Sequence, residues 1–134
     1  MYVGQTPRTP EDYERAKTDA RTKFAAIHRM VKMYPDRIGL AHSPDDVVRL
    51  TREGKLVAAI GIENGYVIGK DLGLVKQYHT LGARYMTLAH GQHNDICDSS
   101  TDQRPAEHGG LSAFGRDVVR EMNRVGMMVD VSHV

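Results

Sequence analysis

Three short apolar runs, rich in β-branched and large apolar residues, constrain the fold of this chain more than any other feature. They span residues 56–62, 84–89 and 127–131. An amphipathic segment with helical spacing precedes the second and third runs, and Gly82 or Gly126 stands where each helix should stop. This strand, helix, glycine, strand order is typical of parallel α/β folds, whose nearly continuous apolar strands are buried on both faces.

Two further helices are predicted before the first run. Thr9 is a hydroxyl cap followed by proline and two acids, and apolar residues then recur at helical spacing until Pro35. Ser43 repeats the start signal for a shorter helix that Gly54 ends. No repeat, linker or low-complexity tract interrupts the 134 residues, so we expect one continuous domain. The later helices are expected at residues 74–81 and 112–125.

Composition argues against several classes of function. The net charge is only +1 and aromatic residues make up 6%, without tryptophan, so neither a nucleic-acid surface nor an anionic membrane surface is indicated. No apolar stretch approaches the ~20 residues of a membrane span. The single Cys97 excludes an intrachain disulfide, and a small loop thiol is a simpler interpretation of it than a catalytic one. The cellular compartment stays open.

A chemically useful side chain follows each apolar run. The first run ends in Glu63, the second in His90 and the third in His133. In parallel α/β folds, and above all in (β/α)₈ barrels, the carboxyl ends of the strands converge on the active site. Carboxylate and imidazole are usual ligands of a catalytic zinc. We therefore expect the three residues to share one site, although Glu63 or His90 alone is better explained as a turn or loop residue and His133 alone has no interpretation.

Other polar residues have open interpretations. The loop 91–100 is either part of that site or a solvated loop with Asx turns. Asp130, inside an apolar run, needs a partner, and it either orients a ligand or meets a backbone donor. Three histidines are expected at the surface, and a fourth begins a turn before the Ser112 cap. They are His28, His42 and His79, and then His108.

Several blocks of the sequence, in a fixed order, resemble the renal or membrane dipeptidase family. The matching segments are residues 61–65, 81–90, 98–99, 108–115 and 118–134. Nearly the whole chain fits, most specifically from Lys55 onward. The resemblance implies a (β/α)₈ TIM-type barrel of the metal-dependent hydrolase kind, of which about three strand–helix units would be present here.

The resemblance also implies a zinc-dependent dipeptidase, which hydrolyses dipeptides through a hydroxide that bridges two zinc ions. Glu63 resembles the carboxylate that bridges both metals, and His133 resembles a ligand of one of them. His90 is similar to the histidine that contacts the substrate. Glu63 and His90 are thus the expected catalytic residues, with Glu63 and His133 as the metal ligands and His90 as the substrate-binding residue.

This chain departs from the family pattern in several places. No His-x-Asp pair precedes Glu63, and the family's further zinc histidine and catalytic aspartate would lie beyond Val134. Asn64 stands where the family often has glycine and His93 where asparagine is usual, so both positions are candidates for an altered substrate preference. We therefore expect residues 1–134 to form a single partial barrel domain, truncated at both ends and about a third of a full-length protein.

Such a piece should bind zinc weakly, show no turnover and tend to self-associate through open sheet edges. Whether the full-length protein is a homodimer stays open. Two rival functions remain: a non-catalytic α/β binding module that is complete at this length, and another metal-dependent amide or lactone hydrolase of the same superfamily.

Overall fold

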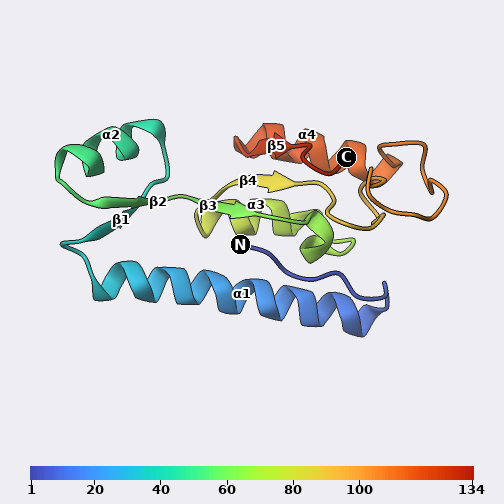
Figure 1. The fold of residues 1–134 in the computed structure, drawn as a ribbon, viewed down its shortest axis with the longest axis horizontal. Coiled ribbons are helices and arrows are strands. Elements are labelled where there is room, and N and C mark those ends of the chain that lie inside the picture. The colour runs from blue at the N-terminus through green and yellow to red at the C-terminus, as the bar shows by residue number, and fades with distance from the viewer.

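The chain alternates helices with parallel strands, and the computed structural model describes all 134 residues (Figure 1). The helices are α1 (Pro10–Met33), α2 (Pro44–Arg52), α3 (Gly73–Thr80) and α4 (Ala113–Val125), with a short 3₁₀ helix η1 (Gly65–Ile68). The strands are β1 (Ile38–Leu40), β2 (Leu56–Ala58), β3 (Ile60–Ile62), β4 (Ala83–Thr87) and β5 (Met128–Asp130). No helix combines the length and the apolar character that crossing a bilayer requires.

The central sheet has the strand order β3-β4-β5, and both of its pairings are parallel. α3 connects β3 to β4, and α4 connects β4 to β5. Strands that are neighbours in sequence are thus neighbours in the sheet, and a helix connects each strand to the next. This βαβαβ arrangement confirms the predicted parallel α/β class, and it brings the carboxyl ends of all three strands to the same edge.

The apolar run 56–62, predicted as one strand, is in fact two strands that belong to different sheets. β2 pairs in parallel with β1, which the sequence did not suggest, and β3 pairs with β4. The register shifts between Ile60 and Gly61, immediately after the break at Ala59. Both halves of the run are equally apolar, so the sequence pattern carries no sign of the point where the chain changes partner.

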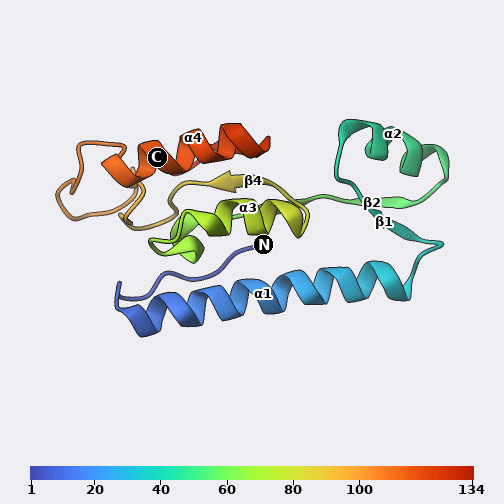
Figure 2. The same ribbon diagram turned by 180° about the vertical axis from the view of Figure 1, so that it is seen from behind.

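The first residues of the chain pair with the free edge of β3. Tyr2 forms a parallel bridge with Glu63, whose N–H donates to the carbonyl oxygen of Met1 at 2.8 Å. The amino group of Met1 donates to the carbonyl of Gly61, and Val3 is buried. Both views place the N-terminus near the middle of the molecule, with the long helix α1 along one side (Figures 1 and 2). Residues 1–3 were not predicted to be extended.

The predicted helix ends are confirmed because they depend on local chemistry. Thr9 and Asp12 form a reciprocal capping box at the start of α1, with the Asp12 N–H donating to the Thr9 hydroxyl at 3.2 Å. The hydroxyls of Ser43 and Ser112 cap α2 and α4 by accepting the backbone N–H groups of Asp46 and Gly115. Gly126 ends α4 with φ = 82°, a left-handed conformation that glycine adopts without strain.

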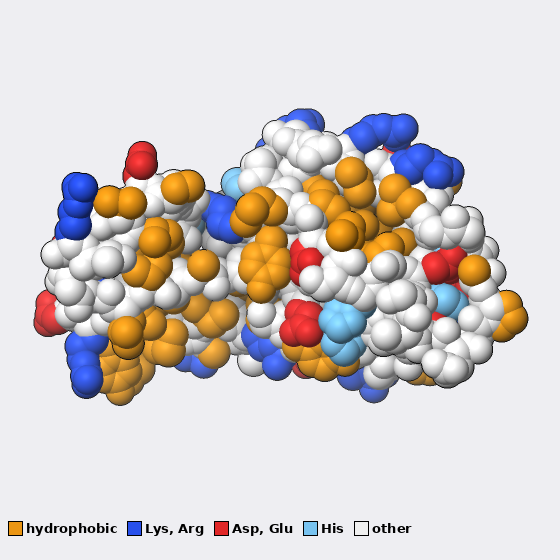
Figure 3. All heavy atoms as spheres, turned by 45° about the horizontal axis from the view of Figure 1, so that its top comes forward, with side chains coloured by type: hydrophobic (Ala, Val, Ile, Leu, Met, Phe, Trp, Pro, Cys, Tyr) orange, Lys and Arg blue, Asp and Glu red, His pale blue; other side chains and the backbone are white.

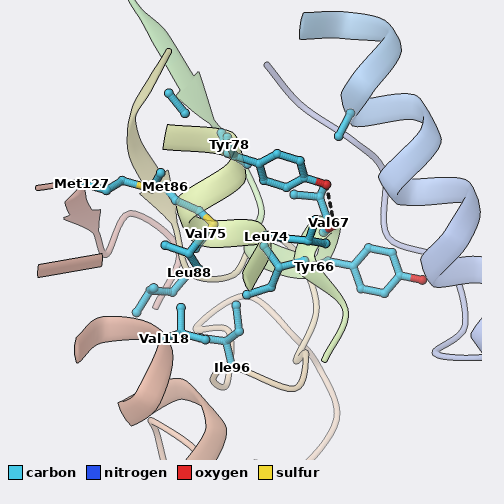
Figure 4. Packing of buried hydrophobic residues seen from close by; sticks show 14 of the residues in the cluster. Tyr66, Val67, Leu74, Val75, Tyr78, Met86, Leu88, Ile96, Val118 and Met127 are labelled. Atoms are coloured by element: carbon cyan, nitrogen blue, oxygen red, sulfur yellow. Dashed lines mark hydrogen bonds between the residues drawn. The ribbon is translucent and has the colours of Figure 1, made fainter. Parts of the chain in front are cut away.

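The core lies between the central sheet and its helices. Figure 4 shows side chains of α3, β4 and α4 meeting there, among them Val75, Met86 and Val118, all fully buried. The Tyr78 hydroxyl, also buried, donates to the carbonyl of Val67 at 3.2 Å. The predicted apolar stripes of α1, α3 and α4 face this core, except that their outermost residues are partly exposed.

The expectation that every strand is buried on both faces holds only for β3, since even Tyr85 of the central strand β4 is 38% exposed. β3 is entirely buried, but Leu56 of β2 is 71% exposed and Met128 of β5 is 63% exposed. Val131, just beyond β5, is also 63% exposed. β5 is an edge strand, and β2 belongs to a separate two-stranded sheet. Apolar side chains are accordingly visible over much of the face drawn in Figure 3.

Candidate metal centre

The structure brings the three predicted strand-end residues together. Glu63 follows β3 directly, while His90 and His133 lie on the short segments after β4 and β5. One ligand atom from each side chain lies within 4.8 Å of the others. The Nε2 atom of His90 is 3.3 Å from Oε1 of Glu63, and the ring centroids of His90 and His133 are 4.4 Å apart. Because parallel strands end at one edge, residues far apart in sequence meet here.

The cluster is open to solvent on one side and flanked by an aromatic ring. The side chain of Glu63 is 44% exposed and that of His90 is 31% exposed. The ring of Tyr2 lies against His90, with 4.8 Å between the centroids and an interplanar angle of 52°. On the face shown in Figure 3, histidine and acidic side chains lie next to each other at the surface. Tyr2 is the neighbour that the sequence did not reveal, because its position depends on pairing with β3.

His133 has a backbone conformation that is unusual for a side chain of its kind. Its φ is 100°, in the region that normally favours glycine. The turn before it is held by Asp130, whose Oδ1 accepts hydrogen bonds from the Ser132 N–H at 2.9 Å and the Ser132 hydroxyl at 2.6 Å. The Thr87 hydroxyl donates to Oδ2 of Asp130 at 2.5 Å. Hydrogen bonds from Ser132 and then Thr87 lower the pKa of Asp130.

Asp130 therefore has the partners that its place in an apolar strand required. It meets a backbone donor, as one of the two interpretations held, together with two hydroxyls. None of these bonds reaches the ring of a site histidine. The carboxylate instead links β4 to the turn that carries His133.

The backbone beside Glu63 has a left-handed conformation at Asn64, which few residue types adopt without strain. The φ of Asn64 is 85°, and its side chain is buried and accepts a hydrogen bond from the Tyr66 N–H at 3.1 Å, which starts η1. The amide of Asn94 donates to the same oxygen at 3.3 Å. Asn64 thus turns away from the three-residue cluster. Glycine and asparagine are the residues that tolerate this conformation best.

The polar loop after His90 is largely folded on itself. The carboxylate of Asp98 accepts the N–H groups of Glu107 and Gly110, both at 2.8 Å, and that of His108 at 3.1 Å. Burial alone would raise the pKa of Asp98, but these donors outweigh it and lower the pKa to about 2. Much of the loop's polarity is therefore structural, as the Asx-turn interpretation of it implied, although the loop is not freely solvated.

His93 belongs to this internal network. The residue is only 2% exposed, and its Nδ1 accepts the Ser99 N–H at 2.9 Å. With Nδ1 an acceptor, Nε2 carries the proton and donates to the carbonyl of Arg104 at 3.2 Å. His93 therefore holds the loop and does not join the three-residue cluster.

The other singled-out residues have no place in the cluster. Cys97 is buried, and desolvation raises its pKa to about 12, which does not suit a thiolate nucleophile. His28 and His42 are exposed, as predicted, whereas His79 is half-buried and its pKa is lowered mainly by desolvation. His108 lies in the predicted turn, with its Nε2 2.9 Å from the carbonyl of Asn94.

The donor set of the cluster suits a zinc ion. Zinc in proteins takes imidazole nitrogen and carboxylate oxygen as ligands, and catalytic sites keep a position open to solvent. Glu63, His90 and His133 offer those atoms at mutual distances that one or two ions can span, and the partial exposure leaves such an open side.

The amino-acid sequence is similar to those of known dipeptidases. Residues 4–134 match the membrane dipeptidase family, peptidase family M19. Dipeptidase tcpJ of Claviceps purpurea is 46% identical over 139 residues, a match that covers 100% of this chain and 32% of that protein. Dipeptidase verJ of Clonostachys rogersoniana is 42% identical, over 80% of this chain and 27% of that protein.

Solved structures agree on the fold. The probable dipeptidase PvdM from Pseudomonas aeruginosa superimposes with a TM-score of 0.87 and 31% identity, covering 93% of this chain and 32% of that one. A dipeptidase of peptidase family M19 superimposes with a TM-score of 0.82 at 23% identity, covering 91% of this chain and 37% of that one. The βαβαβ sheet is therefore part of a (β/α)₈ barrel, the predicted fold class. The chain spans about a third of the length of the curated relatives that it matches over its whole length, and it belongs to the membrane dipeptidase family.

Proposed function

We propose that this chain carries part of the active site of a zinc-dependent dipeptidase. The observation that carries the proposal is the convergence of Glu63, His90 and His133, whose ligand atoms lie within 4.8 Å of one another at the carboxyl ends of three parallel strands. This is the end of the barrel at which catalytic residues gather. Membership of the membrane dipeptidase family supports a dipeptide as the substrate.

Each residue has a proposed role that follows from its chemistry. Glu63 offers two carboxylate oxygens, so it can contribute to two zinc ions at once, and His133 contributes one imidazole nitrogen. His90 lies beside Glu63, with its Nε2 3.3 Å from Oε1 of that carboxylate. An imidazole N–H donated from here to the substrate carbonyl would stabilise developing negative charge on that oxygen. When bound, zinc supplies Lewis acidity and lowers the pKa of a coordinated water.

Zinc titration of the purified 134-residue chain tests the ligand assignment. Isothermal titration should show weak binding, because Glu63 and His133 alone supply the ligands. Glu63→Gln and His133→Ala should each weaken binding by at least the ~10–100-fold that loss of an outer partner of a metal site typically causes. His90→Ala should change it little, and the exposed His28→Ala serves as the matched control. Equal losses for His90→Ala and His133→Ala would make His90 a ligand instead.

Dipeptide binding to the zinc-loaded chain tests the substrate assignment. Addition of a dipeptide should shift the imidazole resonances of His90, whereas a lactone or a cyclic amide should not. We expect no turnover by this chain, and measurable dipeptide cleavage would contradict that expectation. A response to lactones alone would favour another hydrolase of the superfamily. A sharply melting monomer that neither zinc nor a chelator affects would favour the non-catalytic binding module.

A further inference from the structure

We propose that the adjacent residues Ser99 and Ser100 form a backbone clamp that sets the separation of His90 and His133. This inference rests on the proposed function, because the clamp matters only if these two imidazoles act in one site. Neither serine belongs to the cluster of possible ligands. Both would be positioning residues that act through the histidines.

The two arms of the clamp are hydrogen bonds to the two histidine backbones. The Ser99 hydroxyl donates to the carbonyl oxygen of His90. The Ser100 N–H donates to the carbonyl oxygen of His133 at 3.0 Å. Two consecutive residues of one loop therefore hold two site residues that are 43 positions apart in the chain, whose rings lie 4.4 Å from each other.

Both histidines need such support because neither lies on a strand. β4 ends at Thr87 and β5 ends at Asp130, so the segments that carry His90 and His133 have left the sheet. His133 also has φ = 100°, a strained conformation that persists only where the surroundings impose it. The bond from Ser100 fixes the peptide immediately after this strained residue.

The base of the clamp is rigid. Asp98, which precedes the two serines, is buried and accepts three backbone N–H groups from the segment 107–110. Its own N–H donates to the carbonyl of Gly110 at 3.0 Å. The Ser99 N–H donates to His93, which is itself buried. The clamp is therefore anchored to His93, which precedes it in the loop, and to residues 107–110, which follow it. A movement of this loop would move both histidines.

The Ser99 arm can be tested in the metal-free chain by nuclear magnetic resonance. In the unsubstituted chain, the imidazole protons of His90 and His133 should give mutual nuclear Overhauser effects, because the rings are in contact. Ser99→Ala removes the hydroxyl and should weaken or abolish these signals without unfolding the chain, as checked by circular dichroism. Ser99→Thr keeps a hydroxyl and should restore them.

The Ser100 arm has its own matched pair. Ser100→Pro removes the donating N–H, whereas Ser100→Ala keeps it and alters only an exposed side chain. The proline variant should lose the contact between the rings and bind zinc ~10–100-fold more weakly, the usual loss when a group that orients a ligand is removed. The alanine variant should match the unsubstituted chain in both measurements. This pair keeps the test decisive if Ser99→Ala proves too unstable to study.

The outcomes separate the clamp from the proposed function. Unchanged ring contacts in both Ser99→Ala and Ser100→Pro would overturn the clamp, whatever the zinc affinity. Lost ring contacts in these variants, in a chain whose unsubstituted form binds no zinc, would support the clamp and overturn the metal site. The clamp and the metal site would both be supported if Ser99→Ala and Ser100→Pro lose the ring contacts and bind zinc more weakly. In that case Ser99→Thr should restore both properties, and Ser100→Ala should show neither loss.

Discussion

At the residue scale, the two non-glycine residues with positive φ both lie in or next to the candidate site. They are Asn64, beside Glu63, and His133 itself. Strained backbone is retained where the surrounding structure imposes it, which occurs often at functional sites. At both positions hydrogen bonds from the loop 91–111 help to impose it, through Asn94 and Ser100.

Replacement of Asn64 should separate the backbone effect from the side-chain effect. Asn64→Gly and Asn64→Ala both lose the buried acceptor for the Tyr66 N–H, but only alanine places a Cβ at φ = 85°. We expect the glycine variant to have the larger free energy of unfolding, by about 1 kcal/mol, although glycine is normally the less stabilising of the two. Urea unfolding measures the difference. An alanine variant at least as stable as the glycine variant would show that the position is not strained.

The carboxylate of Asp98 should make stability depend on acidity. Its pKa is lowered from 3.8 to about 2, so the folded state favours the charged form. The resulting stabilisation is complete above pH 3.8 and disappears as the pH falls through about 2. The melting temperature should therefore decrease as the pH is lowered from 3.8 to about 2, and it should decrease less steeply in Asp98→Asn. Asp36→Asn, which removes an exposed carboxylate, is the control and should retain the slope of the unsubstituted chain.

At the element scale, local signals fixed the helices and long-range pairing fixed the strands. The caps at Thr9, Ser43 and Ser112 and the stop at Gly126 lie within a few residues of what they control, so the sequence reveals the helix ends. The division of the run 56–62 depends on pairing with β1, which is separated from it in the sequence by the whole of α2. Nothing near Ala59 records that partner, so the sequence could not predict it.

The start of α4 should be intolerant of even one methyl group. A Cβ added at Gly115 would lie 2.0 Å from the carbonyl oxygen of Ile96, a backbone atom that cannot move aside cheaply. A helical Gly→Ala change usually stabilises by up to about 1 kcal/mol, but overpacking costs about 1–3 kcal/mol, so Gly115→Ala should destabilise. Gly91→Ala, where no atom lies within 4 Å, is the control. Thermal melting compares them, and a stabilised Gly115→Ala variant would refute the close approach.

At the scale of the whole molecule, strand order decides which residues meet. The three residues of the candidate site could be chosen from the sequence because each ends a recognisable apolar run, and parallel strands end together. Tyr2 could not be chosen, since it reaches His90 only through the pairing of residues 1–3 with β3. A segment of three residues is too short to show a strand pattern.

The free edge of β5 should promote self-association. Met128 and Val131 are each 63% exposed on or beside this edge strand, and exposed apolar edges are known to pair between molecules. Met128→Lys should shift sedimentation at high concentration toward the monomer. Thr51→Lys, on the exposed surface of α2, adds the same charge elsewhere and should not. Equal effects from both substitutions would point to net charge as the cause instead of the edge.

The pairing of Met1 and Tyr2 with β3 decides how the protein should be produced. Because the pairing is parallel, any residues placed before Met1 would run back along β3 toward Ile60, away from the imidazoles. Residues placed after Val134 would begin two positions from His133. A purification tag therefore belongs at the amino end, and a polyhistidine tag at the carboxyl end would compete directly for the zinc that the titrations are meant to measure.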